Sequence, residues 1–268
     1  MRPSLTLLRS LHLFPSFLVT LLTMAIVPLA DRQSPTSTYL TLGLGMLLFQ
    51  FTIGLVNDIV DIEDDRAAKP RKPLVRYGIS RIAPVILATG MAVAGLVITL
   101  RLSREAWAIG VLGLLCGLSY DVYFKRTEWS WLPYSVAFPL VPIWVYVALD
   151  SWRAMMWWAL PLGAVLGIAL QLANQAPDVA SGQALGLPGR LGERRSRRLA
   201  VGLFEGVACL VAMLLCFESV ILAAGAGVEA ASVLALSMGA TRLLRRDGLF
   251  HLLALGSAIL AVLFLAAA

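Results

Sequence analysis

Acidic and amide side chains are concentrated in one short stretch of the sequence. Five of the 16 acidic residues fall within eight positions, in the segment Asn57-Asp-Ile-Val-Asp-Ile-Glu-Asp-Asp65. If the preceding apolar helix continues here, Asn57, Asp61 and Asp65 lie at i, i+4 and i+8, and Asp58 joins the same face. Carboxylates this close repel one another, and oxygen ligands of this kind suit Mg²⁺. We therefore predict that these four residues hold Mg²⁺ and, through it, a diphosphate.

Basic residues follow the acidic segment immediately. They are Arg66, Lys69, Arg71, Lys72 and Arg76, and prolines at positions 70 and 73 are expected to interrupt any helix there. Arginine can bind a diphosphate through two parallel hydrogen bonds, and lysine as a point charge. Arg66 and Arg71 are therefore candidate diphosphate ligands. The alternative is that these residues only set the orientation of the chain in a membrane.

A second, weaker pair of oxygen ligands occurs much later in the chain. The segment Gln171-Leu-Ala-Asn-Gln-Ala-Pro-Asp178 places Asn174 and Asp178 at i and i+4, just after an apolar stretch. We expect this pair to face the first cluster and to bind a second Mg²⁺. Pro177 makes a continuous helix less favourable. Gly182 stands where a third oxygen ligand would be expected at i+8.

A third polar segment is Tyr120-Asp-Val-Tyr-Phe-Lys-Arg126. Lys125 could reach a diphosphate, Tyr120 could line the mouth of the site, and Asp121 could pair with Lys125 at i+4. The alternative is an aromatic and basic anchor at a membrane surface.

The composition shows what kind of protein must position these groups. The chain has 268 residues, of which 59% are hydrophobic and only 14% charged, against about 25% charged in ordinary globular domains. Such a chain cannot cover a soluble core with polar surface, so soluble globular, disordered and disulfide-stabilised classes are excluded. We predict an all-α polytopic membrane protein. Its net charge of +6 then reflects basic loops on the cytoplasmic side, and no nucleic-acid partner is expected.

Nine stretches are long and apolar enough to cross a bilayer about 30 Å thick. They are residues 13–30, 38–56, 82–100, 106–120, 131–149, 154–173, 199–217, 219–240 and 249–267. The first is expected to be a retained span rather than a signal peptide, because no cleavage site of small residues follows it. With the N-terminus in the cytoplasm, 18 of the 22 Lys and Arg residues fall on the inner side, as the positive-inside rule requires.

The loops are unequal in length. The two long ones, near 57–81 and 174–198, lie on the same inner side and carry the candidate ligands. We therefore expect residues 1–268 to form one nine-helix domain whose active site faces the cytoplasm. The compact length favours a prokaryotic plasma membrane.

The chain resembles the UbiA superfamily of intramembrane prenyltransferases. The resemblance rests on Asn57-Asp-x-x-Asp61-x-x-x-Asp65, on Lys-Pro-Arg-Lys-Pro-Leu-Val at 69–75, on Tyr120 with Lys125-Arg126, and on Asn174-x-x-x-Asp178. It implies nine helices around a central cavity, with two Asp-rich motifs that bind Mg²⁺ and the diphosphate of an isoprenyl donor. Asp61, Asp65 and Asp178 would be catalytic. An allylic cation, held among apolar side chains, would be captured by an aromatic or other lipophilic acceptor, with membrane lipid around it.

Gly182 departs from the second motif of that family, where an aspartate is usual. The alternative function is therefore a non-catalytic membrane homologue that binds a lipid or a quinone. The motifs leave the acceptor open among hydroxybenzoate, naphthoate, homogentisate, a chlorin, a glycerol-phosphate lipid and phosphoribosyl diphosphate.

Overall fold

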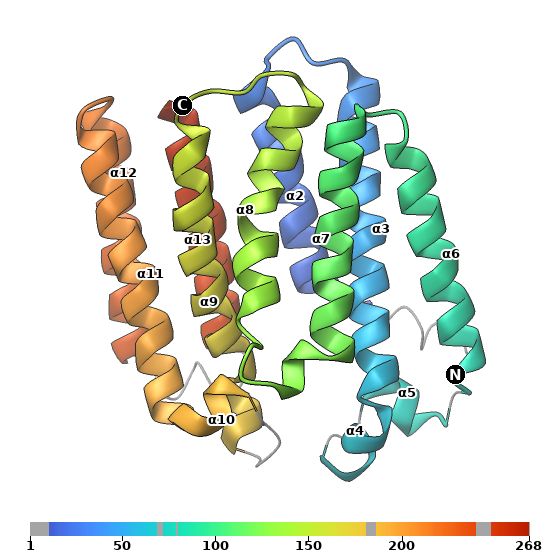
Figure 1. Ribbon diagram of the computed structural model, residues 1–268. Coiled ribbons are helices and arrows are strands. Elements are labelled where there is room, and N and C mark those ends of the chain that lie inside the picture. Colours follow the sequence, from blue (N-terminus) through green and yellow to red (C-terminus); the bar gives the residue numbers. More distant parts are fainter. Residues whose placement is uncertain (1–10, 69–71, 79, 181–185, 240–247, 268) are drawn as a thin grey trace.

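The computed structural model of the protein describes residues 11–68, 72–78, 80–180, 186–239 and 248–267. These residues form helices and short connections, with no strand among them (Figure 1). Four residues singled out from the sequence lie outside the described residues: Lys69, Pro70, Arg71 and Gly182. The prediction of an all-α membrane protein is confirmed.

In the described part of the chain, nine long apolar helices correspond to the nine predicted spans. They are α2 (Leu13–Ala30), α3 (Thr36–Val60), α6 (Ile82–Thr99), α7 (Arg104–Val122), α8 (Leu132–Ala148), α9 (Met156–Ala180), α11 (Glu193–Cys216), α12 (Val220–Gly239) and α13 (Gly248–Ala267). Eight of these have at least 18 residues and enough hydropathy to cross a membrane, and α8 has 17 residues. At 1.5 Å per residue, 18 residues span about 27 Å, close to the thickness of the bilayer core.

The stretches expected to be long loops are mostly helical. Between the spans lie the short helices α4 (Ile62–Ala68), α5 (Pro73–Arg76), η1 (Phe124–Arg126) and α10 (Leu187–Leu191), and α4, α5 and α10 gather at one end of the molecule (Figure 1). Pro73 begins α5, because a proline in the first turn gives up no helical hydrogen bond. Pro177 lies inside α9, which continues to Ala180. Packing of α9 against α8 and α11 supports the helix across this proline.

Seven of the long helices form a closed ring. Going around it, α2, α3, α7, α8, α9, α11 and α13 each contact the next, and α13 returns to α2. Helix α6 packs on α3, and α12 packs on α11 and α13; neither contributes a described residue to the lining of the central cavity. The ring encloses a cavity of about 890 Å³. We expected nine helices around a cavity. The structure refines this expectation: seven helices surround the cavity, and α6 and α12 pack on the outside of the ring.

The outer surface of α6 illustrates why the fold needs lipid around it. Ile82, Ile86, Val93 and Val97 are all more than half exposed. Their spacing places them on one side of the helix. An exposed apolar stripe of this kind is stable in hydrocarbon and not in water.

The α8–α9 contact depends on glycine. A Cβ atom added to Gly167 of α9 would lie 2.7 Å from the carbonyl carbon of Tyr134 in α8, and one added to Gly163 would lie 2.8 Å from the Cα of Pro139. Small residues let membrane helices approach until their backbones touch. These two glycines therefore set the distance between α8 and α9.

Replacing Gly167 with leucine is expected to destabilise the protein by about 1–3 kcal/mol, because the added side chain must push α8 away. Thermal unfolding in detergent measures this as a lower Tm. Gly90→Leu on α6 is the matched control, since nothing lies within 4 Å of a Cβ built there. Equal Tm values for the two variants would contradict the inferred contact.

Candidate functional site

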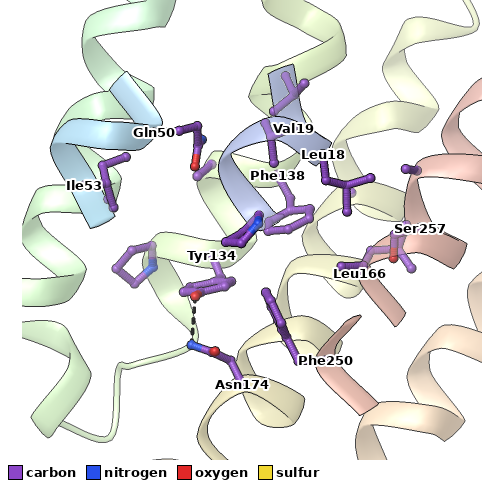
Figure 2. A pocket seen from close by; sticks show the side chains of 18 of the residues that line it. Leu18, Val19, Gln50, Ile53, Tyr134, Phe138, Leu166, Asn174, Phe250 and Ser257 are labelled. Carbon is purple, nitrogen blue, oxygen red and sulfur yellow. Dashed lines mark hydrogen bonds between the residues drawn. The ribbon is translucent and has the colours of Figure 1, made fainter. Parts of the chain in front are cut away.

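The central cavity is polar at one end and apolar along the rest of its length. Its polar end lies where α3, α7 and α9 end, beside the short helices. The residues that line this end are Asn57, Asp61, Lys72, Tyr120, Asp121, Lys125, Asn174, Gln175 and Asp178. Apolar side chains such as Leu18, Val19, Phe138, Leu166 and Phe250 line the remainder (Figure 2). A charged group and an apolar tail could therefore occupy one cavity together.

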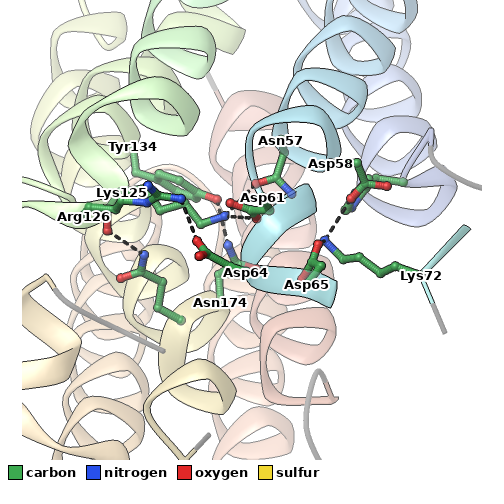
Figure 3. A network of polar contacts seen from close by, with 12 residues as sticks. Asn57, Asp58, Asp61, Asp64, Asp65, Lys72, Lys125, Arg126, Tyr134 and Asn174 are labelled. Atoms are coloured by element: carbon green, nitrogen blue, oxygen red, sulfur yellow. Dashed lines mark hydrogen bonds and ion pairs between the residues drawn. The ribbon is translucent and has the colours of Figure 1, made fainter. Parts of the chain in front are cut away.

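The first oxygen pair, Asn57 and Asp61, faces Lys125. The Lys125 ammonium donates to the Asn57 Oδ1 at 2.9 Å and forms an ion pair with the Asp61 carboxylate (Figure 3). Asn57 belongs to the last turn of α3, Asp61 caps that helix, and Lys125 comes from η1, 64 positions further along the chain. The prediction that Lys125 lies at the site therefore agrees with this geometry, although its present partners are protein oxygens.

Asp58 and Asp65 form a second, separate pair around Lys72. The Lys72 ammonium lies 2.9 Å from Asp58 Oδ1 and 2.6 Å from Asp65 Oδ2, and His12 Nε2 lies 3.1 Å from the same Asp58 oxygen (Figure 3). Both carboxylates are buried, and neither lines the cavity as described. The structure thus divides the four residues that we expected on one face.

Helical geometry explains this division. Four residues advance a helix by about 40° more than one full turn, and seven residues fall about 20° short of two turns. Asn57 and Asp61 therefore stay together, while Asp65 rotates away from Asn57 toward Asp58. The backbone remains helical through this segment, since Asp61 N–H donates to Asn57 O at 3.0 Å and Asp65 N–H to Asp61 O at 2.8 Å.

The environment of Lys72 keeps its charge. Burial alone would lower the pKa of the ammonium, but the neighbouring carboxylates of Asp58 and Asp65 outweigh it and raise that pKa well above its usual value. Lys72 is therefore a fixed cation that neutralises two buried carboxylates, and it ties the start of α5 to the end of α3.

The second oxygen pair comes from α9, which α7 and α8 separate from α3 in the ring. Asn174 and Asp178 both line the polar end of the cavity. The Asn174 amide donates to the Tyr134 hydroxyl at 3.2 Å (Figure 2). The structure thus brings both candidate pairs to one cavity, as the sequence suggested.

A glutamine clamp, which the sequence analysis missed, connects these two halves. The Gln175 amide donates to the backbone oxygen of Lys125 at 3.1 Å, and the Gln171 amide donates to Gln175 Oε1 at 2.9 Å and to Ser130 Oγ at 3.0 Å. Both glutamines are buried. Their spacing of four residues inside an apolar span was the available signal, because a buried amide needs a partner. The clamp fixes the segment that carries Lys125 to the helix that carries Asn174.

The other candidate residues have different surroundings. Tyr120 is buried, lines the cavity and packs its ring edge-on against Tyr134 at 4.9 Å between centroids. Arg66 is exposed and pairs with Glu63 at 2.8 Å outside the cavity lining, so this conformation does not aim it at a diphosphate. The suggested pairing of Asp121 with Lys125 is not formed, because Lys125 reaches across to α3.

The donor chemistry at the polar end fits Mg²⁺. Mg²⁺ usually binds one or two protein carboxylates and completes its shell with water and substrate phosphates. Asn57 with Asp61, and Asn174 with Asp178, each offer one amide and one carboxylate to the cavity. The Lys125 ammonium already sits on the first pair, which shows that these oxygens attract a cation. Within the described ranges, no three His, Cys, Asp or Glu side chains form a group that could hold a metal, so Mg²⁺ here would be bound through these amide and carboxylate oxygens together with water or substrate oxygens.

Comparisons with known proteins agree with this architecture. Among solved structures, an apo UbiA homologue from Aeropyrum pernix K1 superposes with a TM-score of 0.71 at 14% identity, covering 98% of both chains. A UbiA homologue from Archaeoglobus fulgidus bound to GPP and Mg²⁺ gives 0.69 at 15% identity, again over 98% of each chain. A digeranylgeranylglyceryl phosphate synthase gives 0.66 at 16% identity, covering 100% of this chain and 98% of the other. At these identities the likeness establishes the fold.

No curated protein matches the chain. The profile of the UbiA prenyltransferase family, however, matches residues 16–266, which is nearly the whole sequence. The chain belongs to the UbiA prenyltransferase family.

Proposed function

We propose that the protein transfers a prenyl group from an isoprenyl diphosphate to an aromatic or other lipophilic acceptor within the membrane, in a reaction that depends on Mg²⁺. The observation that carries the proposal is the single cavity in which both oxygen pairs and Lys125 lie at one end of an apolar chamber. An isoprenyl diphosphate has the same division between a charged head and an apolar tail.

At the polar end, Asn57, Asp61, Asn174 and Asp178 would hold Mg²⁺. Bound there, Mg²⁺ would neutralise the charge that develops on the departing diphosphate. Lys125 supplies a further positive charge for the diphosphate oxygens. The solved family members bound to GPP and to DMAPP with Mg²⁺ support this choice of donor.

Along the rest of the cavity, apolar residues serve the tail and the cation. Its volume of about 890 Å³ is near the upper end of the range for small-molecule sites, which is about 300–1,000 Å³. Side chains such as Phe138, Leu166 and Phe250 exclude water from the region where an allylic carbon would ionise. Capture by the acceptor is then favoured over hydrolysis.

Lys125 has two roles in this proposal. Without a ligand it neutralises Asp61 and satisfies Asn57. It must leave these oxygens before a metal can take them, and a diphosphate gives the ammonium a new partner. Metal and donor are therefore expected to bind together more strongly than either does alone.

The polar end of the cavity is proposed to face the cytoplasm. Eighteen of the 22 Lys and Arg residues fall in segments on that side of the nine spans, and such an asymmetry sets the orientation of membrane proteins.

Asp61→Asn is expected to weaken Mg²⁺-dependent binding of geranyl diphosphate at least about 10-fold, because a charged ligand is lost where it faces the metal, and to abolish release of diphosphate. Binding and release are measured on purified protein in nanodiscs, with geranyl, farnesyl and geranylgeranyl diphosphates, a panel of aromatic acceptors and an EDTA arm. Asp64→Asn is the matched control, since Asp64 is 60% exposed and pairs with Arg126. A donor that binds without turnover would favour the non-catalytic alternative. Absence of Mg²⁺-dependent donor binding in the folded wild-type protein would refute the proposal.

Lys125→Met is expected to change metal and donor binding in opposite directions. Donor-free Mg²⁺ should bind several-fold more tightly, since the competing ammonium is gone. Donor affinity should fall about 10- to 100-fold through the loss of a charge-assisted hydrogen bond. Isothermal titration measures both constants, and Arg126→Met, which removes a neighbouring exposed cation, is the control. Equal Mg²⁺ affinities in wild type and Lys125→Met would show that the lysine does not compete for these oxygens.

A further inference from the structure

The central cavity is deeper on one side of the ring than on the other. Its lining reaches Ala159, the fourth residue of α9, and Leu265, the third residue from the end of α13. Both positions lie at the end of the molecule opposite to α4, α5 and α10 (Figure 1). On α3 and α7 the lining stops at Gln50 and Gly113, near the middle of each helix. The cavity therefore continues as a deep arm, which is lined from residues 159–166 of α9, 207–211 of α11 and 254–265 of α13.

The sizes of the side chains explain this asymmetry. Phe49 of α3 and Trp144 of α8 are buried, with their ring centroids 6.3 Å apart. A Cβ atom added to Gly110 of α7 would lie 3.2 Å from Trp144 Nε1, so the two rings fill the space between α3, α7 and α8. On α13, by contrast, small residues line the cavity: Ala254, Ser257, Ala258 and Ala261. These small residues leave the space that the deep arm occupies.

The walls of the deep arm suit hydrocarbon. Ser257 is the only polar side chain that the three wall segments contribute to the lining in the described part of the chain. A charged or strongly polar group would find few hydrogen bonds there, and its burial would be costly. The isoprenyl tail is the part of the proposed substrates that consists of hydrocarbon alone. The deep arm therefore fits the tail of the donor.

The length of the deep arm limits the tail that it can hold. Asn174, at the polar end of the cavity, and Ala159 are 15 residues apart on α9, which corresponds to about 22 Å along the helix. An extended isoprene unit adds about 5 Å, because its four C–C bonds of about 1.5 Å are inclined to the chain axis. About four units therefore fit between the diphosphate site and the far end of the deep arm. A tail of two units would leave about half of this length empty.

A second, charged pocket lies beyond the far end of the deep arm. Leu265 is 2% exposed and lines both the deep arm and this second pocket, which has a volume of about 400 Å³. Asp31, Arg32 and Arg153 also line the second pocket. A longer tail would have to pass Leu265 and enter polar surroundings, where apolar surface gains less from burial.

We propose that the donor carries a tail of about four isoprene units, as geranylgeranyl diphosphate does, and that Ala159 and Leu265 set this limit. This inference rests on the proposed prenyl transfer and names its donor. Ala159 acts from α9, because a larger side chain at this position would fill the far end of the deep arm. Leu265 acts from α13, because it separates the tail from the charged pocket.

The test measures binding of unreactive thiodiphosphate analogues with tails of two, three, four and five isoprene units to the protein in nanodiscs with Mg²⁺. Empty nanodiscs correct for partition of each tail into lipid, and inorganic diphosphate reports on the polar end alone. Ala159→Leu and Ala159→Phe shorten the deep arm, and Leu265→Ala lengthens it. Leu160→Phe and Leu255→Ala are the matched controls, since these two side chains are 39% and 49% exposed and lie outside the cavity lining.

We expect wild type to bind the four-unit analogue at least about 10-fold more tightly than the two-unit analogue, because it buries more apolar surface. The five-unit analogue should bind no more tightly than the four-unit analogue. Ala159→Phe should weaken binding of the four-unit analogue about 10-fold, and Ala159→Leu should weaken it less. Leu265→Ala should bind the five-unit analogue several-fold more tightly than wild type does. Unchanged binding of the two-unit analogue and of inorganic diphosphate shows that the variants are folded, and both controls should behave as wild type.

Three results would overturn the inference. If affinity in wild type continues to rise with the fifth unit, the tail does not end at Leu265. If wild type binds the two-unit and four-unit analogues equally well, the depth of the cavity does not select the donor. If Ala159→Phe and Leu265→Ala keep the length preference of wild type, the tail lies elsewhere. A wild-type protein that binds none of the analogues with Mg²⁺ overturns the proposed function itself, and this inference with it.

Discussion

Three carboxylates crowded at the end of a membrane helix must be neutralised, and the rest of the site follows from how this is done. Asp58 and Asp65 are buried around Lys72, and Asp61 faces Lys125. Leaving any of these charges buried without a partner would cost several kcal/mol. The two lysines therefore hold the segments after α3 and after α7 against the end of α3, and they bring residues far apart in sequence to one end of the cavity.

The ring of helices makes this arrangement rigid. Gly163 and Gly167 bring α9 against the backbone of α8, and Gln175 holds the main chain of Lys125 from α9. A lysine whose backbone is fixed but whose side chain carries four methylene groups can move its ammonium without moving the helix. The scaffold can thus stay in place while charge is rearranged at the polar end of the cavity.

The sequence predicted the spans well, because hydropathy is a local property. The length of each membrane helix can be read from the length of its apolar stretch alone. It also suggested that Asn57, Asp61 and Lys125 act at one site, and the structure places all three at the polar end of the cavity. It did not predict that Lys72 separates Asp58 and Asp65 from Asn57, that α6 and α12 stand outside the ring, or that Arg66 turns toward Glu63. Each of these contacts depends on which segment, distant in sequence, packs against the residue or helix in question. The spacing of residues within one helix does not contain that information.

The pairing of charges in the ligand-free protein explains how the site could favour a metal and a diphosphate that bind together over either one alone. With Lys125 on Asp61 and Lys72 on Asp58 and Asp65, most of the charge at the polar end is already paired. In the proposed function, a metal ion alone would have to displace the Lys125 ammonium from Asn57 and Asp61, and a diphosphate alone would have to separate Lys125 from Asp61. In the proposed function, Mg²⁺ would take the place of Lys125 on the oxygens of Asn57 and Asp61 and the diphosphate would bind Lys125, so that every charge would keep a partner. Neutralisation within the protein would thus make binding of Mg²⁺ and binding of the donor depend on each other, through the side chain of Lys125.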